Sequence, residues 1–190
     1  MRALLLLFAT SLLLGAKPSA TPAVDEAEAL KAFAYLNEIR AQPTRYCQQL
    51  KFSPVQVVRR QALIWNDTLA RVAERKAMDM AQRNYFAHVD PDGFGINHYL
   101  DKASYQLDSW WLRDPRENNF ESLQAGCGDG KQAIECLIID YGVPTKGHRT
   151  HLLGVGDWNA SLVDVGIGFV RSDSTTKYPT YTCVIIAKHK

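Results

Sequence analysis

Two histidines and two acidic residues are the side chains of this sequence best suited to chemistry. They are His88, Glu117, Asp140 and His148. Two imidazoles and two carboxylates can hold a divalent cation or move protons near neutral pH. His88 and His148 are therefore the predicted metal ligands, and all four residues are candidates for a catalytic role. Because the histidines are 60 positions apart, only the fold can bring them together.

Each of the four residues also has a purely structural interpretation. Either histidine could be a buried hydrogen-bond donor, and Glu117 could bind backbone amides at the end of a strand. Asp140 could lie at the end of a helix and pair with Lys146 or Arg149. A carboxylate opposes the helix dipole at a C-terminus, which favours a specific partner for Asp140.

Other polar and aromatic residues are weaker candidates. Glu121 and Glu135 could take the second acidic role, but the pattern assigns each to a solvated face. His151 follows His148 by three positions, and we expect it to be peripheral rather than a ligand. Trp110 and Trp111 form a large apolar pair, interpreted either as core packing or as a rim that faces lipid.

The spacing of apolar residues predicts the elements that must position these side chains. It predicts helices over residues 25–40, 44–51, 68–82, 94–102 and 130–141. It predicts strands over residues 117–123, 163–170 and 181–188, the last two joined as a hairpin. Helices followed by antiparallel strands indicate an α+β fold. His88 then follows a helix on a loop, and His148 lies on a short turn or helix.

The first 23 residues are typical of a secretory signal peptide. A basic residue precedes a short apolar stretch, and small residues follow, so cleavage is expected between about residues 16 and 23. No other apolar run reaches the length of a membrane span. We therefore expect one exported domain over residues 24–190, secreted or extracellular, or periplasmic if the source is bacterial.

The four cysteines favour disulfides, because their number is even and the chain is predicted to be exported. Cys127 and Cys136 flank a glycine-rich turn and form the favoured pair. That leaves Cys47 with Cys183, which would tie an early helix to the last strand. The alternative is four free, buried thiols. The spacing does not suggest a zinc site made of cysteines.

The charge pattern gives little support to nucleic-acid binding. The formal net charge is +2, and the basic residues are scattered, with Arg59-Arg60 and residues 188–190 the densest places. Nothing in the sequence indicates an organic cofactor. The sequence leaves the oligomeric state open.

Six segments, in the same order, resemble motifs of the CAP superfamily. This is the SCP-type domain of cysteine-rich secretory proteins, insect venom antigens and plant pathogenesis-related proteins. The segments are LNEIR (36–40), LIWNDTLA (63–70), YFAH (85–88), EN (117–118), GHRTHLL (147–153) and VGIG (165–168). The segment at 147–153 looks like the form found in shorter microbial members.

The resemblance implies an α-β-α sandwich with a central antiparallel sheet flanked by helices. It also implies a surface cleft lined by two histidines and two acidic residues, here His88, Glu117, Asp140 and His148. At Asp140 the chain departs from the many members that have glutamate, and its shorter side chain puts direct contact with a metal in doubt. His151 stands where the family usually has asparagine.

Two functions follow as hypotheses. The first is a secreted binding module whose cleft holds Zn²⁺ or another divalent cation and which binds a lipid, sterol or peptide. The second is a hydrolase, dependent on a metal or on a His–acid pair, acting on a cell-surface or extracellular substrate. The sequence has no His-Glu-x-x-His helix and no recognisable nucleophile elbow, which favours the binding module.

Overall fold

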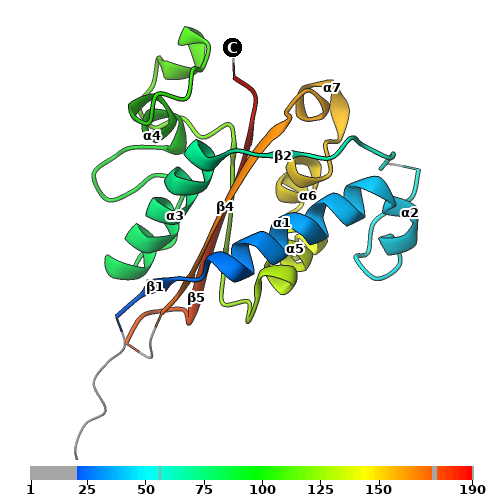
Figure 1. Cartoon of the computed structure of the whole chain (residues 1–190), viewed down its shortest axis with the longest axis horizontal. Coiled ribbons are helices and arrows are strands. Elements are labelled where there is room, and N and C mark those ends of the chain that lie inside the picture. Colours follow the sequence, from blue (N-terminus) through cyan, green and yellow to red (C-terminus); the bar gives the residue numbers. More distant parts are fainter. Residues whose placement is uncertain (1–20, 56, 173–174, 190) are drawn as a thin grey trace, which may run out of the picture.

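A central sheet lies between two layers of helices in the computed structural model (Figure 1). The structure describes residues 21–55, 57–172 and 175–189. Most of the predicted signal peptide, residues 1–20, lies outside these residues. No helix in the described part of the chain is long and apolar enough to cross a membrane. The observed α+β architecture, with helices on both faces of one sheet, confirms the predicted fold class.

Five strands form the sheet in the order β1-β4-β5-β3, with β2 pairing the other end of β4. Their bounds are β1 Ala23–Val24, β2 Ile64–Trp65, β3 Glu121–Ala125, β4 Asp164–Arg171 and β5 Thr180–Ala187. The predicted C-terminal hairpin is confirmed as β4 and β5, which pair antiparallel. All pairings are antiparallel except that of β2 with β4. Strand β5 is buried along its whole length, so the core surrounds it.

Helix α3 (Asp67–Gln82) covers one face of the sheet. Asn66 begins it by accepting hydrogen bonds from two backbone amides of the first turn, which satisfies donors that a helix start leaves unpaired. The helix lies very close to β4, because a Cβ on Gly166 would come within 2.1 Å of the Ala70 backbone nitrogen. The loop after α3 carries His88.

Helices α1 (Glu26–Ala41) and α5 (Gly130–Ile139) cover the opposite face and contact each other. Their starts are joined, since Glu28 Oε2 accepts a hydrogen bond from the Gly130 amide at 2.9 Å. Short helices make the remaining connections: α2 Pro43–Tyr46, α4 Ile96–Lys102, the 3₁₀ helix η1 Ser109–Leu112, α6 Gly147–Leu152 and α7 Gly156–Ala160.

The strand predicted over residues 117–123 is wrong at its start. Strand β3 begins at Glu121, and Glu117 lies in a loop that packs against the start of α4. The Glu117 carbonyl accepts from the Asn97 amide at 3.3 Å, and a Cβ on Gly95 would lie 2.3 Å from that carbonyl oxygen. These backbone groups are therefore committed to α4 and cannot extend the sheet. The helix predicted over residues 44–51 is also shorter, ending at Tyr46.

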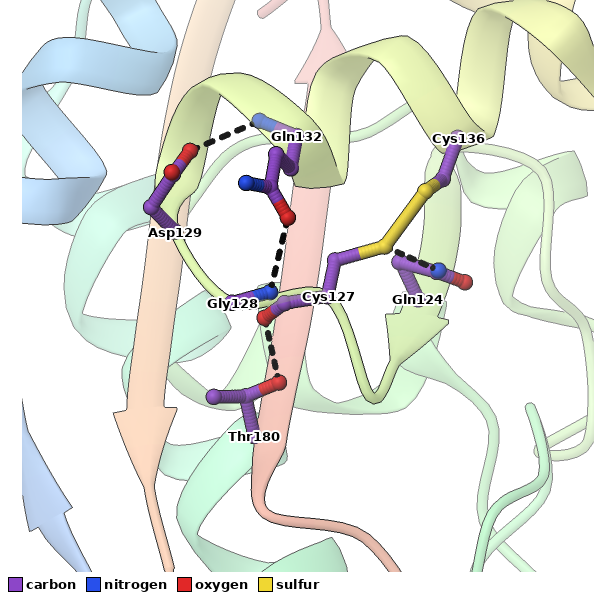
Figure 2. The surroundings of a disulfide bond; sticks show 7 residues. All are labelled: Gln124, Cys127, Gly128, Asp129, Gln132, Cys136 and Thr180. Atoms are coloured by element: carbon purple, nitrogen blue, oxygen red, sulfur yellow. Dashed lines mark hydrogen bonds between the residues drawn. A yellow bond between two sulfur atoms is a disulfide. The ribbon is translucent and has the colours of Figure 1, made fainter.

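The disulfide between Cys127 and Cys136 is present and ties the turn after β3 to α5 (Figure 2). Hydrogen bonds anchor this turn, including Thr180 Oγ1 to the Cys127 carbonyl at 2.6 Å. The predicted Cys47–Cys183 disulfide is wrong, because both residues are free thiols in the structure. Cys183 is buried in β5 and directed at Glu121, whereas Cys47 donates to the Thr44 carbonyl beside α2.

Candidate functional site

The His88 imidazole is hydrogen-bonded to a buried carboxylate. Its Nδ1 lies 2.7 Å from Glu121 Oε2, at the start of β3. The Glu121 side chain is fully buried, whereas the His88 side chain is 42% exposed. Lys76 of α3 fixes the loop by donating to the His88 carbonyl at 2.8 Å. A ring bound through Nδ1 to a carboxylate has its orientation set and its Nε2 left for another partner.

His148 repeats this arrangement on the other helical layer. Asp140 follows α5 in the left-handed conformation, with φ of 52°, and its carboxylate is directed at α6. Oδ1 lies 2.7 Å from His148 Nδ1, and Oδ2 accepts from the His148 amide at 3.0 Å. Neither expected partner binds the carboxylate: Lys146 donates to the Asp140 carbonyl, and Arg149 donates to carbonyls of α5.

The two His–carboxylate pairs meet at one open pocket of about 420 Å³. The ring centroids of His88 and His148 are 6.4 Å apart and the rings are tilted by 35°. Residues of both helical layers and of β3 line the pocket: His88, Asn118, Asn119, Glu121, Ser122, Val143, Thr145, Gly147, His148, His151 and Asn159. The fold thus brings together three of the four predicted site residues. His88 and His148 line the pocket, and Asp140 binds His148 from outside the lining.

Glu117 is the predicted site residue that the structure places elsewhere. It is exposed and does not line the pocket, and Glu121 contacts His88 instead. The assignment of Glu121 to a solvated face was therefore wrong. The sequence holds little signal for this burial, because only Phe120 and Leu123 are apolar in the segment 118–124. Glu135, the other alternative, instead accepts from Tyr35 and Gln49.

The predicted metal ligands can be tested against zinc geometry. Within the described ranges, no three His, Cys, Asp or Glu side chains form a group that could hold a metal ion, so the cleft offers at most two such ligands. Two imidazoles that share one tetrahedral zinc have centroids about 5 Å apart, given Zn–N bonds of about 2 Å. The His88 and His148 rings, at 6.4 Å, would have to approach by about 1 Å. The donor set fits two imidazole ligands, with the carboxylates orienting them.

His151, which we expected to be peripheral rather than a ligand, lines the pocket. It is buried beneath the pocket, with Nε2 3.2 Å from the Ile186 carbonyl and Nδ1 2.8 Å from Ser122 Oγ. Because a carbonyl only accepts, Nε2 carries the proton and Nδ1 accepts from the serine hydroxyl. Burial, followed by the charges of His148 and Arg40, lowers the pKa of His151 to about 4. His151 is therefore neutral at neutral pH.

An aromatic cluster borders the same pocket. Trp111 packs against Phe120, which precedes Glu121, and against Trp158, which precedes Asn159. Trp110 stacks on Trp111 and is 49% exposed. The interpretation as core packing applies to Trp111, whereas Trp110 presents an apolar surface to solvent.

Comparison with known proteins supports the family resemblance. The family profile described as "Cysteine-rich secretory protein family" (CAP) matches residues 33–186. No curated protein sequence matches the chain significantly.

Two solved structures share the fold. One is an extracellular protein containing an SCP domain from Bacillus anthracis, 21% identical with a TM-score of 0.55, matched over 86% of this chain and 41% of that one. The present chain thus spans about two fifths of the length of the Bacillus protein. The other is an outer surface protein from Borrelia burgdorferi, 18% identical with a TM-score of 0.55, matched over 87% of this chain and 96% of that one. With the family match over most of its length, the chain belongs to the cysteine-rich secretory protein (CAP) family.

Proposed function

We propose that the protein is an exported CAP-domain binding protein whose cleft holds a divalent cation, most suitably Zn²⁺, between His88 and His148. One observation carries the proposal: both imidazoles are anchored through Nδ1 to buried carboxylates and line the same pocket. Zinc-bound histidines are commonly oriented in this way, with Nε2 as the ligand. The extracellular and outer-surface proteins that share the fold support export.

The cation would supply a Lewis-acidic centre with open coordination positions. Glu121 and Asp140 would keep the protons on Nδ1 of the two rings, so that Nε2 is the basic nitrogen on each. Their carboxylates are themselves buried, which adds negative charge beneath the cation without occupying its coordination positions.

The pocket also offers groups that a bound ligand could use. Asn118 Oδ1 is a buried acceptor with no hydrogen-bond partner among the described residues, and Asn118 lines the pocket. A buried unsatisfied acceptor is destabilising unless a ligand or water donates to it. The exposed face of Trp110 adds apolar surface beyond the Phe120–Trp158 cluster. We therefore propose a lipid, sterol or peptide ligand with a donor group that reaches Asn118.

A hydrolase is the second candidate, and one observation favours it. Each histidine of the cleft lies 2.7 Å from a carboxylate, which is the arrangement of an oriented general base. Peptide and ester substrates in a turnover assay separate the two functions. A binding module shows no turnover, whereas a hydrolase loses its turnover on His88→Ala or His148→Ala while the variant remains folded.

Zinc titration by calorimetry at neutral pH tests the cation site. We expect saturable binding to the wild-type protein and none to the folded His88→Ala/His148→Ala double variant. Glu121→Gln should bind zinc about 10–100-fold more weakly, because a neutral amide orients the His88 ring less well. Glu117→Gln is the matched control and should bind as the wild type does. Absence of saturable binding to the wild type, or equal effects of the two glutamate variants, would contradict the proposed site.

A further inference from the structure

A buried arginine near the end of α1 has one donor nitrogen without a partner among the described residues. Arg40 is only 3% exposed, and its Nη1 donates to the Leu152 carbonyl at 2.8 Å. Its Nε is buried and has no hydrogen-bond partner among the described residues. Gly154 makes room for this guanidinium, because a Cβ there would lie 3.1 Å from Arg40 Nη1. A buried donor without a partner is destabilising, so an acceptor supplied by a bound ligand would be favourable here.

Two further arginines, Arg59 and Arg60, line a pocket together with Arg40. The Arg60 amide donates to the Arg40 carbonyl at 2.9 Å, and this contact brings the segment 59–62 onto the end of α1. Arg60 Nε is likewise buried without a partner in the described part of the chain. The pocket has a volume of about 270 Å³. It is lined by Arg40, Arg59, Arg60, Gln61, Ala62, Ala160, Leu162 and Val163.

None of the described residues that line this pocket is acidic. Burial and the neighbouring charge of Arg60 lower the pKa of Arg40 to about 10, so the guanidinium is still protonated at neutral pH. The pocket thus holds three positive charges without a carboxylate in its lining. Like charges in a partly desolvated pocket repel each other, and an anion would remove both the repulsion and the unpaired donors.

We propose that this pocket binds a phosphate group through the guanidinium groups of Arg40, Arg59 and Arg60. Phosphate carries several acceptor oxygens and up to two negative charges, which matches three forked donors better than a carboxylate does. The volume is just below the range of about 300–1,000 Å³ seen for drug-sized ligands, so it suits a small anion or the phosphate end of a larger molecule. Ala160, Leu162 and Val163 supply apolar contacts for such a carrier.

The structural role of Arg40 explains only part of this arrangement. A cation in the last turn of a helix is favoured by the helix dipole, and the bond to Leu152 ties α1 to α6. Neither contact uses Arg40 Nε, and neither explains why Arg60 buries its own Nε beside a second guanidinium. Among the residues that the structure describes, none lines both this pocket and the His88–His148 cleft, so the two sites are separate.

Titration of the full chain with inorganic phosphate, at constant ionic strength set with chloride, tests the proposal. Calorimetry should show saturable phosphate binding to the wild type. The affinity of Arg60→Gln should be lower by a factor of about ten or more, the loss expected for one charge-assisted hydrogen bond. Arg113→Gln, which removes an exposed arginine elsewhere, has the same net charge and should bind as the wild type does. Arg59→Gln provides a second variant at an exposed position, and thermal melting followed by circular dichroism confirms that each variant is folded.

Vesicles distinguish the source of the phosphate. Phosphatidylcholine vesicles with and without phosphatidic acid are sedimented with each protein. Binding that needs phosphatidic acid and is lost in Arg60→Gln assigns the site to a lipid phosphate, whereas phosphate binding without vesicle binding assigns it to a soluble one. Either outcome supports the site. Absence of saturable phosphate binding to the wild type, or the same affinity for folded Arg60→Gln and Arg113→Gln, overturns it.

Discussion

The His88–His148 cleft and the arginine pocket differ in the charged side chains that surround them. In the cleft, each imidazole is bound to a buried carboxylate at 2.7 Å. In the arginine pocket, three guanidinium groups line a space that has no acidic residue in its lining. Residues of the segment 147–160 line both regions, His148 and Asn159 in the cleft and Ala160 in the pocket.

This difference indicates which ligand each region can take. Two buried carboxylates lie against the imidazoles of the cleft, and this negative charge favours a cation. The three guanidinium groups, with no carboxylate among the described residues that line the pocket, leave net positive charge there, which favours an anion. His151 lines the cleft, and both His148 and Arg40 contribute to the lowering of its pKa. Variants in both regions can therefore test the comparison.

Asp140→Ala should have the largest effect. Asp140 accepts from two nitrogens of His148, so the substitution leaves both without their acceptor. Alanine is also strained at a φ of 52°. Together these effects should lower the free energy of unfolding by about 3 kcal/mol. Asp140→Asn is the matched control, with a smaller loss, because asparagine tolerates this backbone and keeps one acceptor oxygen. Urea denaturation measures both, and equal losses would contradict the paired-carboxylate account.

The pH dependence of stability tests the burial of His151 at the cleft. Its pKa in the folded protein is about 4, below the value of about 6.5 in the unfolded chain. Between these values the unfolded state binds the proton more readily, so stability falls as the pH falls from 6.5 to 4. The loss from this group should be about 3 kcal/mol over the whole range.

His151→Asn removes the group that titrates and can keep a bond to Ser122. The difference in unfolding free energy between the wild type and this variant, measured by urea denaturation at several pH values, isolates the contribution of His151. We expect this difference to shift by about 3 kcal/mol in favour of the variant between pH 6.5 and pH 4. A difference that does not vary with pH would show that His151 takes up its proton equally in both states.

The sequence predicted the architecture better than the loops. Helix α3 and the β4–β5 hairpin were predicted within one or two residues, because local capping and strong apolar alternation determine them. The strand expected at 117–123 was misplaced because α4 uses the backbone groups around Glu117, a contact between segments some 20 residues apart. Local alternation carries no information about such contacts.

The candidate site was predicted in part for the same reason. His88, Asp140 and His148 line or support the cleft, and the two-residue match at Glu117-Asn118 misdirected the choice of the fourth residue. The sequence holds little signal for the burial of Glu121, since only one of its two chain neighbours, Phe120, is apolar. The arginine pocket could not be predicted either, because the hydrogen bond from the Arg60 amide to the Arg40 carbonyl depends on how the segment 59–62 returns to the end of α1. In the sequence, Arg59 and Arg60 indicate only a locally dense basic charge.

Arg60→Gln should have the smallest effect on the free energy of unfolding. The sign of this effect, with and without phosphate, tests the comparison most directly. Without phosphate, in chloride buffer, the substitution removes repulsion on Arg40, so stability should be unchanged or rise by less than about 1 kcal/mol. With saturating phosphate the wild type should become more stable to unfolding than Arg60→Gln, because the anion binds and stabilises the wild type more. Urea denaturation in the two buffers measures both states, with Arg113→Gln as the control that should not reverse. A loss above about 1 kcal/mol in chloride would mean that Arg60 already has a partner within the protein, as the cleft histidines do.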